Sequence, residues 1–201
     1  MNDREVGAPP YPGPWPDNPK YDHVLLREGD KRNVIDKYRY WKVSAIKGDL
    51  DKNRVPLQVA IENFQNDFNI GTIVRNANAF NVQAVHIIGR RHWNRRGAMV
   101  TDAYMNVFYH KSVTDFTQVM RKENLKIIAI DITDKSKPLS AFHLPKNAVL
   151  VFGGEGPGIS RDLLEEADDI VMVEQLGSTR SVNVGVASGI AMYEWSKTHV
   201  L

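Results

Sequence analysis

From residue 55 onward, short apolar segments alternate with segments of helical spacing, and this alternation restricts the fold more than any other feature. The apolar runs that predict strands are residues 57–61, 84–88, 107–109, 125–130, 149–152 and 170–173. The patterns typical of helices are residues 70–80, 116–122, 160–167 and 184–197. Strands separated by helices pair in parallel, and the helices cover both faces of the sheet. The sequence therefore predicts an α/β fold with a mainly parallel sheet and helices on both faces.

The residues before this alternation have a different composition. Prolines cluster in the first 20 residues, where they remove backbone donors and favour extended chain, so we expect a poorly structured arm. A helix rich in lysine and arginine is predicted within residues 30–50. We therefore divide the chain into an N-terminal extension, residues 1–54, and one domain, residues 55–201.

Composition excludes several classes of protein. Hydrophobic residues make up 42% of the 201 residues, enough to bury a core, so the chain is not disordered throughout. No apolar run reaches the roughly 20 residues of a membrane-spanning helix, and no secretory signal pattern is present. The absence of cysteine excludes disulfides, thiolate metal sites and cysteine nucleophiles. We therefore expect a cytoplasmic protein that does not bind a membrane.

The charge of the chain is distributed unevenly. The net charge is only +2, but basic residues are in excess within residues 27–54 and 86–111, and acidic residues after residue 112. The two basic stretches either form a positive surface that attracts nucleic acid or are ordinary solvated faces. The histidines show no metal-ligand spacing, so we expect no metal site.

Three stretches combine polar side chains with glycines, and the first is residues 69–75. It opens the helix that follows the first predicted strand. Asn69 is placed to cap this helix, and Gly71 permits another group to approach closely. Arg75 lies among apolar residues of the same helix and needs a partner, because an unpaired guanidinium is costly to bury. That partner is either a structural acid or a ligand.

The second stretch, residues 152–158, holds four glycines between a strand and a helix. Glycine-rich turns at strand ends bind cofactors in open α/β sheets through exposed main-chain amides. The spacing fits neither the dinucleotide fingerprint nor a phosphate loop, and the acidic Glu155 would repel a pyrophosphate. The turn therefore suits a cationic ligand or a partner arginine, unless it is only a tight turn.

The third stretch, residues 177–191, places hydroxyl and amide side chains before a helix rich in small residues. Ser181 or Asn183 is positioned to cap this helix. Glycine in a helix costs roughly 1 kcal/mol relative to alanine, so the small residues indicate that another backbone comes close. That backbone belongs either to the same chain or to a second subunit.

Together the three stretches resemble the ordered motifs of the SpoU/TrmH family, S-adenosylmethionine-dependent RNA 2′-O-ribose methyltransferases of the SPOUT superfamily. The resemblance covers about residues 55–198. The residues that carry it are Asn69, Gly71 and Arg75, then Phe152-Gly-x-Glu155-x-x-Gly158, then Ser181-Val-Asn183-Val.

This resemblance implies a deep trefoil knot of SPOUT type in the C-terminal part, which topology rules alone would not predict because knots are rare. It also implies a homodimer through the knot region, with S-adenosylmethionine bound in the knot and the catalytic arginine across or beside the interface. The positions that match the family's donor contacts are Ile130, Gly153, Val173, Leu176 and Val182. Val182 stands where leucine is common in the family.

In the family's reaction a ribose 2′-hydroxyl attacks the donor methyl group, and the resemblance makes Arg75 the catalytic residue. Because the pKa of arginine lies above about 12, we expect Arg75 to hold the ribose oxygen and stabilise the developing alkoxide rather than act as a base. The resemblance also assigns Asn69, Glu155, Ser181 and Asn183 to the site. We expect Glu155 to orient Arg75 or Asn183. The reaction requires no metal.

The segment after the second predicted strand is a candidate RNA contact. It places arginines around a tryptophan, and its residues are Arg90, Arg91, Trp93, Arg95 and Arg96. Arginine pairs with phosphate and stacks on bases, and tryptophan offers a stacking surface. The alternative is a basic surface loop whose tryptophan packs on the core. The basic helix within residues 31–47 is a second candidate.

The sequence thus favours an RNA ribose methyltransferase, with tRNA preferred over ribosomal RNA because the chain is compact. Two alternatives stay open. One is a catalytically idle RNA-binding relative, which the presence of all the site residues disfavours. The other is a nucleotide-cofactor enzyme of Rossmann type, which the glycine spacing disfavours.

Overall fold

The structure is a computed structural model that describes residues 7–64, 69–154 and 157–201. The chain divides into two compact units, Met1–Asn53 and Arg54–Leu201. Within the described residues, no helix has both the length and the apolar character needed to cross a membrane.

The first unit is built from short elements. They are α1 (His23–Glu28), α2 (Val43–Leu50) and two 3₁₀ turns, Asp36–Tyr38 and Asp51–Asn53. The single basic helix predicted within residues 30–50 is therefore wrong over its first half, and only α2 is an α-helix there.

A buried carboxylate explains why the predicted helix starts late. Asp30 is fully buried and accepts hydrogen bonds from Arg32 Nε (2.9 Å) and from the backbone nitrogen of Tyr40 (2.9 Å). Tyr40 has a φ of +62°, in the left-handed region that a helix does not contain. The chain between these residues therefore closes into a loop around Asp30, and α2 begins only at Val43.

The proline-rich segment is anchored from residue 7 onward, so the expectation of a poorly structured arm is wrong there. Ala8 and Asp30 exchange two backbone hydrogen bonds of 2.8 Å, and the backbone nitrogen of Tyr11 donates to the carbonyl of Leu26. The contact is close because Gly29 has no side chain: a Cβ there would lie 2.6 Å from the carbonyl oxygen of Ala8.

The second unit is a seven-stranded sheet in the order β3-β2-β1-β6-β4-β7-β5, and every neighbouring pair is parallel. Its strands are β1 (Val55–Asn63), β2 (Val82–Gly89), β3 (Val107–His110), β4 (Lys126–Ile130), β5 (Lys137–Pro138), β6 (Ala148–Phe152) and β7 (Asp169–Met172). Its α-helices are α3 (Ile70–Ala79), α4 (Val113–Lys122), α5 (Arg161–Glu166) and α6 (Val184–His199). The predicted parallel α/β fold is confirmed, and only β5 and the 3₁₀ turns were not predicted.

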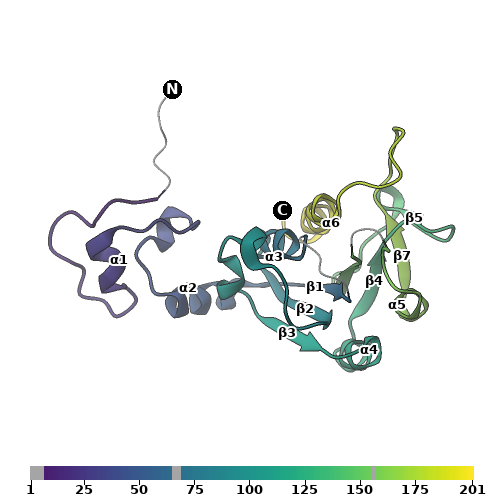
Figure 1. The fold of residues 1–201 in the computed structure, drawn as a ribbon, viewed down its shortest axis with the longest axis horizontal. Coiled ribbons are helices and arrows are strands. Elements are labelled where there is room, and N and C mark those ends of the chain that lie inside the picture. The colour runs from purple at the N-terminus through teal and green to yellow at the C-terminus, as the bar shows by residue number, and fades with distance from the viewer. Residues whose placement is uncertain (1–6, 65–68, 155–156) are drawn as a thin grey trace. The chain divides into compact units, whose positions relative to one another are not determined.

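Helices cover both faces of the sheet because side chains alternate along each strand. On β1, Val59 packs in one buried cluster with residues of α3 and α6. The next residue, Ala60, belongs to a second cluster that contains Phe116 of α4 and Leu163 of α5. Figure 1 shows these two pairs of helices on opposite sides of the strands. Each face therefore has its own hydrophobic core.

The strand order reverses beside β1, and this places the functional residues. β1 pairs with β2 on one side and with β6 on the other, and β6 in turn separates β1 from β4. Ligands in open parallel sheets bind beyond the carboxyl ends of the strands at such a reversal. The segments that follow β4, β6 and β7 at this end of the sheet are therefore the candidate ligand site. The trefoil knot in the C-terminal path stays a prediction.

Candidate functional site

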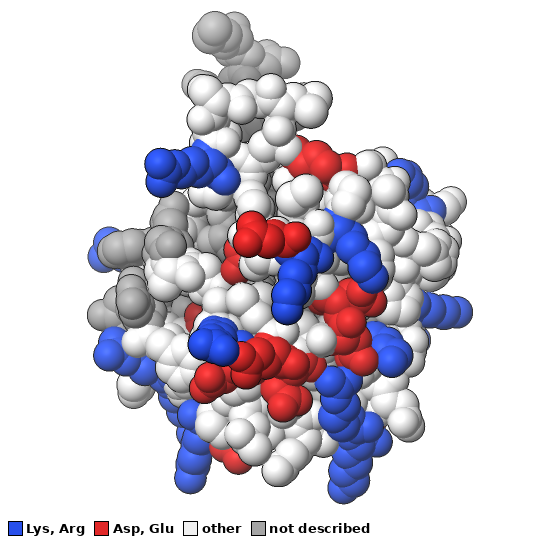
Figure 2. All heavy atoms as spheres, turned by 90° about the vertical axis from the view of Figure 1, so that its right-hand side faces the viewer, with Lys and Arg blue, Asp and Glu red and all other residues white. Residues whose placement is uncertain are grey.

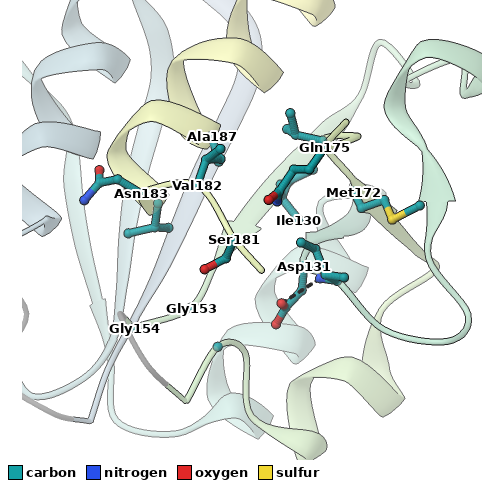
Figure 3. Close-up of a pocket in the computed structure, with 14 residues that line it drawn as sticks. Ile130, Asp131, Gly153, Gly154, Met172, Gln175, Ser181, Val182, Asn183 and Ala187 are labelled. Atoms are coloured by element: carbon teal, nitrogen blue, oxygen red, sulfur yellow. Dashed lines mark hydrogen bonds between the residues drawn. The ribbon is translucent and has the colours of Figure 1, made fainter. Parts of the chain in front are cut away.

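A cavity of about 260 Å³ lies at the carboxyl ends of β4, β6 and β7, beside the first turns of α6 (Figure 3). The described residues that line it are Ile130, Asp131, Ile132, Gly153, Gly154, Gly158, Met172, Val173, Gln175, Ser181, Val182, Asn183, Val184 and Ala187. The second and third polar stretches of the sequence therefore meet at one cavity, although they are distant in the chain.

The glycine-rich turn forms one wall of the cavity from main chain. The backbone nitrogen of Gly158 donates to the carbonyl of Gly154 at 3.1 Å, so the turn folds back on itself. A Cβ on Gly153 would lie 2.1 Å from the carbonyl carbon of Gly158, far inside any permitted contact. Gly158 has a φ of +69°, which also favours glycine. The turn therefore requires these glycines.

The predicted donor-binding residues are placed in two groups. Ile130, Gly153, Val173 and Val182 line the cavity. The side chain of Leu176 is fully exposed, and Leu176 is not among the described residues that line the cavity. The structure thus brings together four of the five positions.

The first and third stretches are joined by an asparagine pair. Asn183 Nδ2 donates to Asn69 Oδ1 at 2.8 Å, and Asn69 is buried. Asn183 Oδ1 accepts from the backbone nitrogen of Gly185 at 2.9 Å, so Asn183, rather than Ser181, caps α6. The sequence predicted that the side chain of Asn69 caps α3. The structure shows no such side-chain cap, because the Asn69 side chain is turned to Asn183. Ser181 and Asn183 both line the cavity.

The small residues of α6 serve a contact inside the chain. Asn76 Nδ2 on α3 donates to the carbonyl of Gly185 (2.8 Å) and to Ser188 Oγ (3.0 Å). A Cβ on Gly185 would lie 2.7 Å from Thr72 Cγ2, so the glycine allows α3 and α6 to touch. The sequence left open whether the neighbouring backbone belongs to the same chain or to a second subunit. At these positions it belongs to the same chain.

Arg75 lies on α3 but not in the cavity of the single chain. Its side chain is exposed, and it forms no ion pair with the described residues. The sequence argument that Arg75 is buried and therefore needs a partner is wrong, because this position of α3 faces solvent. Glu155, predicted to orient Arg75 or Asn183, lies outside the described residues.

The arginine segment packs against the beginning of α3. Arg90, Arg91, Arg95 and Arg96 are exposed. Trp93 instead packs on the main core, and its indole nitrogen is buried without a hydrogen-bond partner among the described residues. Trp93 therefore makes the core contact of the alternative, and the guanidinium of Arg95 lies over its ring at 5.6 Å from the centroid.

A pair of glycines fixes this arginine segment in place. A Cβ on Gly71 would lie 2.8 Å from the Cα of Gly97, which follows Arg95 and Arg96 directly. The close approach predicted for Gly71 is thus made by the arginine segment itself. Arg95 and Arg96 are thereby held beside the helix that carries Arg75.

Sequence reasoning missed two acidic residues near the cavity. Asp131 lines it, and its carboxylate accepts from the backbone nitrogens of Ile132 (2.7 Å) and Ile159 (2.8 Å). Glu62 is buried at the end of β1 and accepts from the backbone nitrogen and the hydroxyl of Ser160, both at 2.6 Å. Burial raises the pKa of Glu62, against the lowering effect of the bonds from Ser160. Their position in the sequence could have indicated both residues, because each acid stands at the carboxyl end of an apolar strand.

Gln175 was also missed. It lines the cavity, and its Oε1 atom is buried without a hydrogen-bond partner among the described residues. A buried amide oxygen normally has a partner, so this atom is available to a ligand donor.

A parallel sheet covered on both faces, with a glycine-walled cavity beyond the carboxyl ends of its strands, defines a ligand-binding α/β domain. The profile of the SpoU rRNA methylase family matches residues 56–193. The chain belongs to this family, and the resemblance seen in the three sequence stretches is confirmed.

Individual relatives agree with this assignment. The chain is 24% identical over 148 residues to the tRNA (guanosine(18)-2′-O)-methyltransferase of Escherichia coli, a match that covers 72% of this chain and 65% of that enzyme. It is 27% identical over 194 residues to the 23S rRNA (guanosine-2′-O-)-methyltransferase RlmB of Neisseria meningitidis, covering 89% and 78%. The crystal structure of the TrmH/SpoU tRNA modifying enzyme of Aquifex aeolicus superposes with a TM-score of 0.67 at 24% identity, covering 77% of this chain and 81% of that one.

Proposed function

We propose that this protein transfers a methyl group from S-adenosylmethionine to the 2′-hydroxyl of a ribose in structured RNA. The observation that carries the proposal is the hydrogen bond of 2.8 Å between Asn183 Nδ2 and Asn69 Oδ1, beside the glycine-walled cavity. It joins the helix that carries Arg75 to the segment that lines the donor pocket. The names of the E. coli and N. meningitidis relatives, both 2′-O-methyltransferases, support the reaction class.

The residues of the cavity fit an adenosine-containing donor. The main-chain wall formed by Gly153 and Gly158 accepts a flat or bent ligand without side-chain interference. Gln175 Oε1 has no hydrogen-bond partner among the described residues, so it can accept from an exocyclic amine or a hydroxyl of a ligand. When bound, the donor supplies an electrophilic methyl group on a sulfonium.

The protein's own part in the reaction is to position and to stabilise charge. Arg75 holds the ribose oxygen and stabilises the negative charge that develops on it, because a guanidinium stays protonated at neutral pH. Asn69 and Asn183 fix the junction between α3 and α6 that sets the position of Arg75. Since Arg75 is exposed in the single chain, we propose that the donor and Arg75 meet across or beside a dimer interface.

The reaction is tested with purified protein, radiolabelled S-adenosylmethionine and either bulk tRNA or ribosomal RNA. We expect label in RNA and, after alkaline hydrolysis, in resistant dinucleotides, because a 2′-O-methyl group blocks cleavage at the next phosphodiester. We propose tRNA as the substrate, so the label should be greater in tRNA. Donor binding without transfer to either RNA would favour the idle relative, and binding of a nicotinamide dinucleotide would favour the Rossmann alternative.

We further propose that RNA binds along the arginine segment. Its four arginines are exposed, whereas on the face shown in Figure 2 basic and acidic side chains stand next to each other. Arg121 on α4 pairs with Asp168 at 2.6 Å, and Arg161 on α5 pairs with Glu165 at 2.7 Å. In the arginine segment Arg95 pairs with Asp102 at 3.4 Å, but Arg90, Arg91 and Arg96 form no ion pair within the described residues. The segment is therefore the better candidate for a positive contact surface.

Reversing two of these charges should weaken RNA binding. For Arg95→Glu combined with Arg96→Glu, we expect RNA affinity to fall about tenfold at moderate salt. The slope of log affinity against log salt should fall by about two. Fluorescence anisotropy with tRNA measures both quantities. The matched control is Lys122→Glu with Arg161→Glu on α4 and α5, which should retain most of the affinity. Equal losses in the two double variants would remove the arginine segment from the RNA contact.

We propose a homodimer that uses the outer face of α6. Val186, Ile190 and Tyr193 follow helical spacing on this helix, and their side chains are 55%, 40% and 53% exposed. A stripe of large exposed apolar side chains is typical of a protein contact. A homodimer is also what the family resemblance implies.

Ile190→Asp should convert the dimer into a monomer, because it places an unpaired charge in the apolar contact. Sedimentation or light scattering should report twice the chain mass for the wild type and the single chain mass for the variant. Val119→Asp changes an exposed apolar residue on α4 and should remain dimeric. A wild-type protein that is monomeric at all concentrations would contradict the proposal.

A further inference from the structure

The cavity has a charge of its own. Among the described residues that line it, Asp131 is the one with an ionisable side chain; the others are apolar residues, glycines, amides and a hydroxyl. The described wall contains no lysine, arginine or histidine. The described lining therefore carries a negative charge without a balancing positive one.

Main-chain hydrogen bonds hold this charge in place without cancelling it. Asp131 Oδ1 accepts from Ile132 N at 2.7 Å, the bond drawn in Figure 3, and Oδ2 accepts from Ile159 N at 2.8 Å. Both donors are neutral amides. Within the described residues Asp131 takes part in no ion pair with lysine or arginine. The carboxylate is therefore oriented by neutral donors, and its field acts on the cavity.

The backbone around Asp131 is fixed as well. Its backbone nitrogen donates to the carbonyl of Val171 at 3.0 Å, and its own carbonyl accepts from Ser136 Oγ at 2.9 Å. The glycine turn comes so close that a Cβ on Gly158 would lie 2.7 Å from Asp131 Oδ2. These contacts orient the carboxylate toward the glycine turn at the wall of the cavity.

We propose that Asp131 makes the cavity select a cationic ligand over its neutral counterpart, so that the sulfonium donor binds in preference to its thioether product. This inference rests on the proposed function. The donor carries a positive charge at sulfur, and transfer of the methyl group leaves a neutral thioether. A fixed anion nearby attracts the first and not the second, and this attraction is weakly screened inside a cavity. Asp131 thus limits product inhibition.

The test compares two ligands in two proteins. S-adenosylmethionine and S-adenosylhomocysteine are titrated into the full chain by calorimetry, and the ratio of their dissociation constants is the readout. For Asp131→Asn we expect the preference for the sulfonium ligand to fall roughly tenfold. Asp134→Asn removes an exposed charge three residues away on the same connection, outside the lining, and should leave the ratio unchanged.

The ratio separates this role from a structural one. If Asp131 only anchors the glycine turn, both ligands lose affinity by the same factor, the ratio stays at the wild-type value, and the inference is overturned. If Asp131→Asn does not fold, Asp131→Ser, which keeps a hydroxyl acceptor for one of the two amides, carries the same comparison. A wild-type chain that binds neither ligand refutes the proposed function itself, which is a different outcome.

Discussion

Replacing Arg75 by alanine should lower the rate of methyl transfer about 10²- to 10³-fold while leaving the affinity for S-adenosylmethionine near the wild-type value. The reason is geometric. Arg75 is exposed on α3 and is not among the described residues that line the cavity, so its loss removes no contact with a donor bound there. What it removes is the positive charge that would stabilise the developing alkoxide of the ribose.

The measurement pairs single-turnover transfer with calorimetric titration of the donor. Arg75→Lys keeps the charge but loses the planar fork of donors, so we expect a loss between those of the wild type and the alanine variant. Arg161→Ala removes an exposed arginine on α5 and should be nearly silent in both assays. Near-normal turnover in Arg75→Ala would refute the catalytic role.

The alternation of apolar runs and helical patterns was sufficient to predict the sheet and its helices. Buried parallel strands such as β6 (Ala148–Phe152) are apolar at every position, and this makes them visible in the sequence. The three polar stretches meet because they follow strands of this sheet, and strand ends at one edge of a parallel sheet converge. The expectation that they form one site came from the motif resemblance.

Other features of the structure leave no repeating pattern in the sequence and could not be predicted from it. Asp131 and Glu62 are single acids after strands, and only the folded chain shows that main-chain amides hold them. Trp93 could stack on RNA or pack on the core, and residue type alone does not decide between them. In the first unit, the buried Asp30 overrides helix propensity through contacts with Arg32 and Tyr40. Each of these outcomes depends on tertiary contacts that a local pattern does not encode.

Replacing Gly153 by alanine should have the largest effect on stability. The added Cβ would lie 2.1 Å from the carbonyl carbon of Gly158 and 2.4 Å from the backbone nitrogen of Ile159. These are main-chain atoms, so no flexible side chain can move aside. Relief requires the turn to open, and we expect a loss of about 3 kcal/mol in the free energy of unfolding. For a domain of this size, that corresponds to a fall in Tm of roughly 6–12 °C.

Opening the turn also moves the wall of the cavity, so the same variant should bind S-adenosylmethionine at least about tenfold more weakly. Calorimetric melting and donor titration check the two effects separately. Gly177→Ala is the matched control, because a Cβ there meets nothing within 4 Å, and its Tm should stay close to that of the wild type. Equal Tm values for the two alanine variants would mean that Gly153 and Gly158 do not approach each other as described. Lowered stability with unchanged donor affinity would instead separate the glycine turn from the donor site.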